Sequence, residues 1–309
     1  SRSFIDIFLH SPPVNEESFR DWLLAHVEKH EIQLIVPSRD EDLRALVDLK
    51  ELLLEKYACR ILVPSSSVLT ICQNKELFSN WCLSNGFQVP KSYLLNQVVE
   101  ESLPIFVKPK IGAGSKGTML IDSWNQWLEV SKDLDDSYLI QEYISAPEYT
   151  IDLFVDRNNR VLSVVPRLRQ ITFNGESIRA KIDLDSEIID QATKLAQKLC
   201  LEAHNTVQCF KTKTGVVFSE VNARFGGGFS LGVESGADTP RFLIREQKGL
   251  AALTKEASIN DGLEMIRVQK DIIFSSQGLK IFCFDLDGTI CTESCAYEEA
   301  QPMPFIVAK

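Results

Sequence analysis

The first seventy residues alternate short apolar runs with longer segments whose apolar residues fall at helical spacing. The runs at 4–9, 32–36 and 60–63 predict buried strands, and the segments 16–30 and 41–57 predict helices. Strands separated by helices are typical of a small parallel sheet, because each helix returns the chain to the start of the next strand. No G-x-G-x-x-G motif occurs in this part, so it lacks the dinucleotide-binding fingerprint.

After residue 73 the pattern becomes a mixture of strands and helices. Apolar runs predict strands at 104–109, 118–121, 138–143, 149–155 and 161–166. Apolar residues at helical spacing predict helices at 74–86, 124–134, 187–199 and 239–252. Charged turns follow up to residue 278, so we expect a linker at 256–278.

Two further apolar runs, 206–210 and 216–222, predict a β-hairpin. Gly215 suits the left-handed position of a three-residue loop at 213–215. This loop sets three cross-strand pairs: Thr212 with Val216, Phe210 with Phe218, and Gln208 with Glu220. Alternation along the second strand puts Phe218, Glu220 and Asn222 on one face.

The polar residues of this hairpin predict a metal–phosphate site. Burying Glu220 and Asn222 on a mostly apolar strand is costly without a partner, and both carry oxygen atoms of the kind that magnesium coordinates. The predicted register adds Gln208 to the same face. Arg224 comes next, and three glycines at 226–228 give a backbone able to close around an anion. The alternative is a strand with a solvated polar face that ends in a flexible loop.

Residues 112–117 form a second glycine-rich segment, between two predicted strands. The segment lacks the G-K-[ST] ending of a Walker A loop, but its three glycines could let backbone amides cover phosphates. Lys108 precedes it in an apolar strand, where an ammonium needs an anionic partner. A plain glycine-rich turn, and an edge-strand lysine in solvent, are the alternatives.

The order of these motifs resembles one family. Along the chain come Lys75 at a helix start, Lys108 before the glycine-rich segment, residues 141–144 followed by Glu148, and then Gln208, Glu220, Asn222 and Arg224. Over roughly residues 1–250 this order resembles the ATP-grasp superfamily, and within it the carbamoyl-phosphate-synthetase-like carboxylate–amine ligases. The resemblance implies an α/β fold of the α+β ATP-grasp type. We expect a small parallel-sheet N-terminal subdomain at 1–72 and an ATP-grasp domain at 73–255, with a lid subdomain at about 88–140 and an antiparallel-sheet C-terminal subdomain.

The resemblance also implies how ATP is bound. Lys75 and Lys108 would hold its phosphates, and the loop at 112–117, including Gly114 and Ser115, would cover them. A hinge segment would bind the adenine edge through its backbone: Gln141, Glu142, Tyr143 and Ile144. Glu148 would bind the ribose hydroxyls.

For the metal and the transferred phosphate the resemblance implies a further set. Gln208, Glu220 and Asn222 would be ligands of magnesium (or manganese), and Glu220 could bridge two ions. Arg224 would face the transferred phosphate, so Arg224 and Lys108 are the expected catalytic residues. The chain departs from the family at Ala223, where proline is usual, and its N-terminal subdomain looks short.

The expected activity is an ATP-dependent ligase that activates a carboxylate as an acyl-phosphate and joins it to an amine. Metal ions and cationic side chains would offset the repulsion between the two anions, and no protein nucleophile is needed. The alternatives are kinase-like transfer to a non-carboxylate acceptor and a non-catalytic ATP-binding module. Arg167 and Arg169, which share a face of an extended segment, and Arg179 are candidates to bind the substrate carboxylate or the γ-phosphate; the alternative is solvated surface arginines.

The composition limits the classes of molecule that we expect this protein to bind. The 309 residues are 44% hydrophobic and 25% charged, which is typical of a globular protein, and the net charge of −10 argues against a nucleic-acid groove. No apolar run approaches the ~20 residues of a membrane span. We therefore expect small-molecule carboxylate and amine substrates, no nucleic acid and no membrane; a homodimer is compatible with this class.

The eight cysteines include no C-x-x-C pair and mostly occupy apolar runs, so we expect reduced thiols and a cytoplasmic protein. The four histidines, at 10, 26, 30 and 204, are scattered, and we expect them in solvated positions or at a helix end. No signal-peptide pattern occurs at the start. The chain opens on Ser1 rather than methionine, so an upstream part could be missing.

Residues 279–289 carry a second motif, in which an apolar strand delivers Asp285 and Asp287 onto a glycine turn. This motif resembles the first motif of haloacid-dehalogenase phosphatases, which implies a nucleophile at Asp285 and an acid/base at Asp287. Only twenty residues follow residue 289 (309 − 289), too few for such a domain. We expect 279–309 to be the truncated start of that domain, without activity of its own, in a longer parent that combines both domains.

Overall fold

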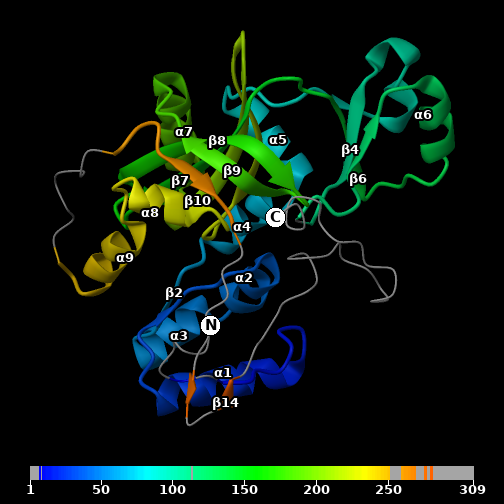
Figure 1. Cartoon of the computed structure of the whole chain (residues 1–309). Coiled ribbons are helices and arrows are strands. Elements are labelled where there is room, and N and C mark those ends of the chain that lie inside the picture. The colour runs from blue at the N-terminus through cyan, green and yellow to red at the C-terminus, as the bar shows by residue number, and fades with distance from the viewer. Residues whose placement is uncertain are drawn as a thin grey trace. The chain divides into compact units, whose positions relative to one another are not determined.

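A computed structural model describes residues 7, 9–112, 114–250, 259–268, 275–276 and 279–280 (Figure 1). Contacts divide the chain into one unit of residues 1–265 and another of residues 266–309. The described residues of the second unit include two short strands, β13 (Ser275–Ser276) and β14 (Leu279–Lys280), which pair antiparallel. The haloacid-dehalogenase-like motif with Asp285 and Asp287 lies outside the described residues, as does part of the expected linker.

The N-terminal part of the first unit contains two parallel strands, β1 (Leu34–Ile35) and β2 (Arg60–Ile61). Three helices accompany them: α1 (Glu17–Lys29), α2 (Asp40–Val47) and α3 (Lys50–Tyr57). Their shared core includes Phe19, Val27, Leu43, Leu46, Leu53 and Ile61. The predicted small parallel sheet is confirmed. The strand expected at 4–9 is absent at Ile7 and Leu9, and its other residues lie outside the described part.

The prediction of one helix at 41–57 is wrong, because the segment forms two helices. α2 ends at Val47 and α3 begins at Lys50. Between them Leu49 N–H donates to Leu46 O (3.0 Å), a tight turn that ends the first helix. Leucines on both sides of this turn still reach the core, so the apolar spacing resembled that of one continuous helix.

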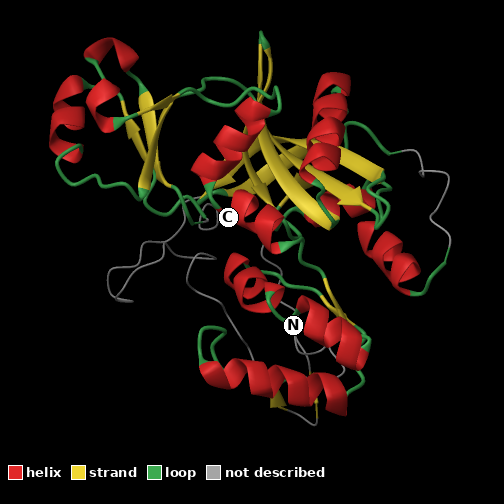
Figure 2. Cartoon of the chain, turned by 180° about the vertical axis from the view of Figure 1, so that it is seen from behind, coloured by secondary structure: helices red, strands yellow, loops and turns green. Residues whose placement is uncertain are grey.

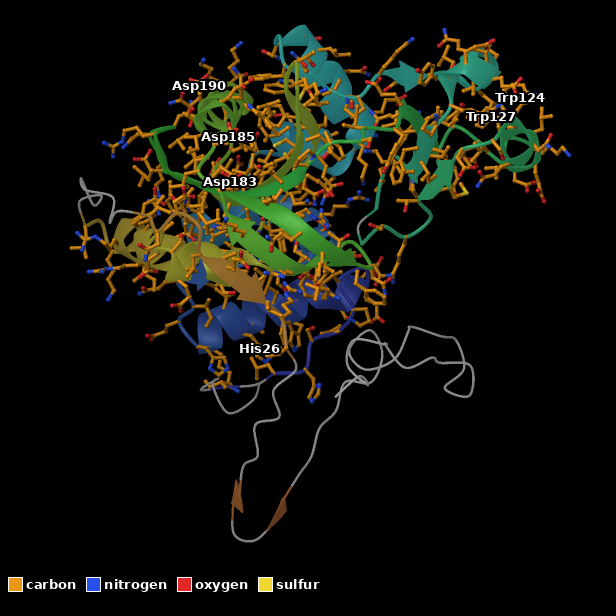
Figure 3. The ribbon with its side chains drawn as sticks, turned by 45° about the horizontal axis from the view of Figure 1, so that its top comes forward. His26, Trp124, Trp127, Asp183, Asp185 and Asp190 are labelled. Carbon is orange, nitrogen blue, oxygen red and sulfur yellow. The ribbon has the colours of Figure 1, made fainter. Side chains whose placement is uncertain are left out.

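Two helices and a four-stranded antiparallel sheet follow. The helices are α4 (Ser66–Gln73) and α5 (Lys75–Ser84). The sheet has the order β3-β6-β4-β5, with β3 (Ser92–Tyr93), β4 (Ile105–Pro109), β5 (Met119–Ile121) and β6 (Tyr138–Glu142). Two 3-10 helices, Leu95–Gln97 and Glu100–Ser102, lie between β3 and β4. α6 (Trp124–Val130) contributes Trp124 and Trp127 (Figure 3) to the core of this sheet.

The largest sheet has six strands in the order β11-β10-β7-β8-β9-β12. It is the larger of the sheets drawn in yellow in Figure 2. Its strands are β7 (Glu148–Val155), β8 (Val161–Phe173), β9 (Glu176–Ile182), β10 (Ala203–Thr212), β11 (Gly215–Asn222) and β12 (Glu264–Ile266). The remaining helices are α7 (Ser186–Leu199), α8 (Phe229–Glu234) and α9 (Thr239–Gln247). α7 shares the largest apolar core with β7, β10, β11 and α5. Among the described residues, no helix is long and apolar enough to cross a membrane.

The hairpin of β10 and β11 confirms the pairing of Gln208 with Glu220 but not the predicted loop. Thr212 pairs with Gly215 rather than Val216, so the loop has two residues, Lys213 and Thr214. Phe210 accordingly pairs with Val217 rather than Phe218.

A β-bulge then restores the predicted pair. Phe218 lies opposite Cys209 and Glu220 lies opposite Gln208, which leaves Ser219 as the extra residue. Phe218 joins the apolar core together with Val221. The expectation that Phe218 shares a face with Glu220 is therefore wrong, because the bulge interrupts the alternation between them.

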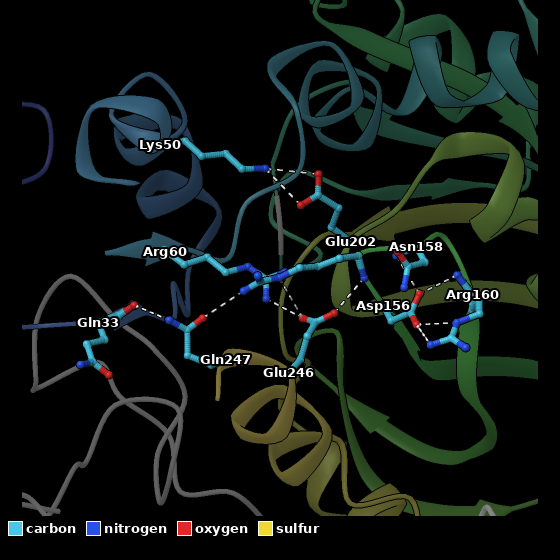
Figure 4. Close-up of polar contacts among 10 residues, drawn as sticks. Gln33, Lys50, Arg60, Asp156, Asn158, Arg160, Glu202, Glu246 and Gln247 are labelled. Carbon is cyan, nitrogen blue, oxygen red and sulfur yellow. Dashed lines mark hydrogen bonds and ion pairs between the residues drawn. The ribbon is translucent and has the colours of Figure 1, made fainter. Parts of the chain in front are cut away.

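A polar network joins the β1–β2 part to the six-stranded sheet and α9 (Figure 4). Lys50 Nζ lies 3.1 Å from a carboxylate oxygen of Glu202. The Glu246 carboxylate accepts hydrogen bonds from the Arg60 guanidinium and from Arg157 N–H. These contacts hold the N-terminal segment, including α2, against the strands that carry the site.

Candidate active site

Two adjoining cavities contain most of the predicted site residues. The first has a volume of about 580 Å³ and lies among β4, the glycine-rich loop, the β6–β7 connection and the β10–β11 hairpin. The second has a volume of about 640 Å³ and lies between α2 and the end of β11. Lys75, Gly112 and Glu220 line both cavities. A molecule in one cavity therefore lies next to a molecule in the other.

Lys108 is a buried cation at the wall of the first cavity. It is only 8% exposed, on a strand that lies between β6 and β5, so it is not an edge-strand lysine in solvent. Within the described part of the chain its ammonium has no hydrogen-bond or ion-pair partner. Burial lowers the pKa of Lys108 to about 8; the nearby Glu220 carboxylate opposes this shift and the Lys75 ammonium adds to it. Such a group is stabilised by an anion in the cavity.

Lys75 connects the glycine-rich loop to β11. It is the first residue of α5, where the Asn74 side chain caps the helix by accepting from Glu76 N–H and Leu77 N–H. Lys75 Nζ donates to Gly112 O (2.6 Å) and lies 3.8 Å from Glu220 Oε2. The two lysines thus lie on the same side of the first cavity as Glu220.

The predicted metal ligands meet at one end of the hairpin. Gln208 and Glu220 line the first cavity, and Glu220 and Asn222 line the second. The Asn222 amide donates to Glu220 Oε1 (3.0 Å). One carboxylate with two amide oxygens is a donor set that fits a hard cation such as Mg²⁺. No group of three or more His, Cys, Asp or Glu suited to a metal occurs among the described residues.

The segment expected to be a hinge connects β6 to the wall of the first cavity. Gln141 is buried, and its amide donates to Pro90 O (3.4 Å) and to Ser92 Oγ (3.3 Å). The Glu142 carboxylate accepts from Lys91 N–H (2.8 Å). These two side chains therefore hold the strand in place, while Tyr143 and Ile144 follow them along the cavity wall.

Glu148 and Arg169 form an ion pair in the same cavity. Arg169 Nη1 donates to Glu148 Oε1 (2.7 Å), and Arg169 Nη2 donates to Gly175 O (2.7 Å). Burial raises the pKa of Glu148, and the Arg169 guanidinium opposes that shift. One oxygen of the Glu148 carboxylate is thus paired, and Arg169 links it to the turn between β8 and β9.

The turn between β8 and β9 lies against the glycine-rich loop. Gly175 has a φ of +76°, and a Cβ added there would lie 2.7 Å from Ser115 Oγ and 3.1 Å from the carbonyl carbon of Gly114. Only a residue without a side chain permits this close approach. Gly114, Ser115 and Gly175 all line the first cavity, so the two loops meet beside it.

The structure separates the three candidate arginines. Arg169 lines the first cavity, whereas Arg179 is partly exposed and pairs with Glu264 (2.7 Å). Arg167 is 2% exposed and makes a double hydrogen bond to Asp152, at 2.7 and 2.9 Å. A Cβ at Gly228 would lie 2.4 Å from Arg167 Nη1. The buried pair therefore packs directly against the loop of three glycines at 226–228 and supports it.

A second buried contact supports the same loop. The ring of His204 stacks on Phe225, with centroids 4.0 Å apart, and the Thr206 hydroxyl donates to Arg224 O (3.0 Å). His204 is 3% exposed, so the expectation of a solvated position is wrong for this histidine. Burial lowers the pKa of His204 to about 4, which keeps the ring neutral near pH 7.

Arg224 makes a contact that the sequence did not indicate. Its Nε and Nη2 atoms donate to the two carboxylate oxygens of Asp40, at 3.0 and 2.8 Å. Asp40 opens α2, 184 residues earlier in the chain. The expected phosphate-binding arginine is therefore paired with an acid at the border of the second cavity.

The chain is similar to known proteins in both sequence and fold. The family described as "ATP-grasp in the biosynthetic pathway with Ter operon" matches residues 135–270. A D-alanine–D-alanine ligase of Corynebacterium efficiens is 27% identical over 183 residues, which is 50% of this chain and 51% of that protein. One from Mycobacterium avium is 25% identical over 150 residues, 40% of each chain. The chain thus spans about half the length of the curated relatives it matches.

Solved structures show the same fold. An L-amino acid ligase from Bacillus licheniformis superimposes with a TM-score of 0.64 at 17% identity, covering 87% of this chain and 71% of that one. The biotin carboxylase domain of a Hydrogenobacter thermophilus 2-oxoglutarate carboxylase gives 0.64 at 16% identity, covering 83% and 62%. With the mixed α/β sheets described above, these likenesses show that the chain shares the fold of these structures, and the family match at residues 135–270 is to an ATP-grasp model.

Proposed function

We propose that this domain binds MgATP in the first cavity and is an ATP-dependent ligase that joins a carboxylate to an amine. The observation that carries the proposal is Lys108, a buried ammonium without a partner among the described residues, facing the same cavity as Gln208 and Glu220. The curated relatives named above are D-alanine–D-alanine ligases, and the Hydrogenobacter domain was solved with MgADP. These names support the reaction class, while the residues support the site.

In this proposal Lys75 and Lys108 hold the phosphates and the loop at 112–117 covers them. Gln208, Glu220 and Asn222 hold magnesium (or manganese), which supplies positive charge beside the phosphates when bound. Arg224 turns from Asp40 toward the transferred phosphate. Tyr143 and Ile144 contact the adenine, held in place by Gln141 and Glu142, and Glu148 uses its unpaired oxygen for the ribose.

The reaction would have two steps. A carboxylate oxygen attacks the γ-phosphorus, the bond to the leaving ADP breaks, and an acyl-phosphate forms. The amine nitrogen then attacks the acyl carbon, inorganic phosphate leaves, and the nitrogen loses a proton. Covering the site protects the acyl-phosphate from water, which is the role we assign to the lid at about 88–140. A small-molecule substrate pair and a homodimer belong to the same proposal.

MgATP binding should take up a proton at alkaline pH. The pKa of Lys108 lies at about 8 without ligand, and a polyanion beside the ammonium raises it, so binding above pH 8 must protonate the lysine. We expect uptake of about half a proton at pH 8, almost none at pH 6, and weaker binding as pH rises above 8. Calorimetry in buffers of different ionisation enthalpy measures this uptake.

Lys108→Arg is the matched control for this prediction. Arginine keeps its proton throughout this range, so the variant should bind MgATP without proton uptake. Equal proton uptake by the wild type and the variant would contradict the assigned role of Lys108.

Gly175→Ala should raise the KM for ATP about 5- to 10-fold. A methyl group at a positive φ costs about 1 kcal/mol and would also push the turn away from Ser115 and Gly114. Gly249→Ala is the control, because its φ of +64° carries a similar backbone cost and a Cβ there meets nothing within 4 Å. Steady-state kinetics measures this difference. If Gly175→Ala and Gly249→Ala had the same KM for ATP, the contact between the two loops would not contribute to ATP binding.

One incubation tests the proposed function. The full chain is mixed with ATP, magnesium and a pool of amino acids and small carboxylates, and the products are identified by mass spectrometry. ADP, phosphate and an amide product support ligation. ADP with a stable phosphorylated product would instead indicate a kinase, and MgATP binding without turnover would indicate a non-catalytic module. Lys108→Met serves as the inactive control.

A further inference from the structure

One arginine of the first cavity contacts two parts of the site that the proposed function assigns to opposite ends of ATP. Arg169 lies on β8, and its side chain is only 6% exposed. Its Nη1 donates to Glu148, the acid proposed for the ribose, and its Nη2 donates to Gly175 O, both at 2.7 Å. Within the described part of the chain its Nε has no hydrogen-bond partner. One bond on each side thus connects the acid to the turn between β8 and β9.

The turn itself is tight and touches the glycine-rich loop. Asn174 and Gly175 lie between the paired ends of β8 and β9, and both have a positive φ, 46° and 76°. Positive φ at both positions is typical of the shortest turns between adjacent strands. A Cβ at Gly175 would lie 2.7 Å from Ser115 Oγ. A shift of Gly175 therefore also moves the surface against which the loop packs.

We propose that Arg169 is a positioning residue that makes recognition of the ribose and of the phosphates of ATP cooperative. This inference rests on the proposed function and adds a role to the same site. Ribose hydroxyls that donate to the unpaired oxygen of Glu148 fix its carboxylate. The carboxylate then holds Arg169, and Arg169 holds the carbonyl of Gly175. The loop at 112–117 accordingly closes against a turn that is already in place.

The physical basis of this coupling is conformational entropy. Whichever end of the nucleotide binds first restricts Glu148, Arg169 and the turn, and that step bears the entropy loss. The other end then binds to groups that are already restricted, so each end raises the affinity for the other. Arginine suits this role because two nitrogens of its planar guanidinium hold Glu148 and Gly175 O at once, whereas a lysine ammonium has one nitrogen.

A set of four nucleotides measures the coupling. ATP, 2′,3′-dideoxy-ATP, AMP and 2′,3′-dideoxy-AMP are titrated by calorimetry into the full chain with magnesium. The quantity of interest is the factor by which removal of the hydroxyls weakens binding, divided for the triphosphates by the same factor for the monophosphates. In the wild type this ratio should be about 5 to 10, at the lower end of couplings between ligands in proteins.

Variants of the arginine isolate its part in the ratio. Arg169→Lys keeps the charge but has a single nitrogen for two partners, and Arg169→Met removes the charge as well. In both, the ratio should fall to about 2 or less, whereas a merely structural role would weaken all four nucleotides alike and leave the ratio unchanged. Arg179→Lys is the matched control, because Arg179 lies on the neighbouring β9, pairs with Glu264 and lines neither cavity.

Hydrogen exchange gives a second readout, in the loop itself. AMP carries the ribose but lacks the β- and γ-phosphates that the loop would cover. At saturating concentrations, AMP should slow amide exchange at residues 114–117 of the wild type, and 2′,3′-dideoxy-AMP should not. In Arg169→Lys and Arg169→Met, AMP should leave this exchange unchanged, because the connection from Glu148 to the turn is broken.

Three results would overturn the inference while MgATP still binds. The first is a wild-type ratio of one, which means that the hydroxyls contribute equally in ATP and AMP. The second is a wild-type ratio that both Arg169 variants retain. The third is loop protection by AMP that persists in both variants. A chain that binds neither ATP nor AMP gives a different result, because it removes the proposed function itself.

Discussion

Replacing Glu220 by glutamine should lower kcat about 1,000-fold or more. Glu220 is the one carboxylate among the three proposed metal ligands, and it also lies 3.8 Å from Lys75 Nζ. A neutral amide coordinates Mg²⁺ more weakly, and the several kcal/mol of charge stabilisation that a bound metal supplies is lost with it. ADP release at saturating ATP and magnesium measures the effect.

The matched control for this prediction is Glu264→Gln. Glu264 lies on β12 of the same sheet, pairs with Arg179 and lines neither cavity, so the same change of charge should leave kcat within about twofold. If Glu220→Gln retained wild-type turnover and the same magnesium dependence, the proposed metal site would be wrong.

Asp152→Asn should produce the largest loss of stability. Asp152 and Arg167 are each 2% exposed and are joined by two hydrogen bonds. Removing one charge leaves the other buried without a partner, which costs about 3–5 kcal/mol in the free energy of unfolding. Urea unfolding followed by tryptophan fluorescence measures the change. Because Arg167 supports Gly228, the variant should also lose affinity for MgATP.

Two controls separate the cost of leaving a buried charge unpaired from the cost of losing an exposed ion pair. Asp190 on α7 (Figure 3) is 52% exposed and pairs with Lys194, so Asp190→Asn should cost less than about 0.5 kcal/mol. The double change Asp152→Leu with Arg167→Met replaces the buried pair by apolar side chains and should recover most of the stability. Equal losses for Asp152→Asn and Asp190→Asn would contradict this account.

The sequence predicted most helices and strands of the fold but missed those in which apolar residues do not recur at a regular spacing. Strands such as β4, β6 and β7 and helices such as α5 and α7 lie where apolar spacing predicted them. β9 was missed because charged residues, Arg179 and Lys181, interrupt its apolar run. The hairpin of β10 and β11 shows a deeper limit. The pairing of Gln208 with Glu220 was predicted from a loop one residue too long, and the bulge at Ser219 compensated for that error.

Some residues of the candidate site could be predicted from their side-chain chemistry and from the order of the motifs along the chain. Lys75, Lys108 and Glu220 are such residues, and the structure brings them to one cavity. Their partners were not predictable, because the pairing of Arg224 with Asp40 depends on packing between segments 184 residues apart. Likewise Arg167 and Arg169 are equivalent in the sequence pattern, yet one is buried beneath a loop and the other lines the cavity.

The measurement that tests the central claim most directly is an anomalous difference map. Crystals of the full chain are soaked with manganese and a non-hydrolysable ATP analogue, and data are collected near the manganese edge. We predict a peak within about 2.5 Å of a Glu220 carboxylate oxygen and of the Asn222 amide oxygen, with the phosphates beside Lys108. A nucleotide bound with its metal away from Glu220 and Asn222, or phosphates remote from Lys108, would contradict the account.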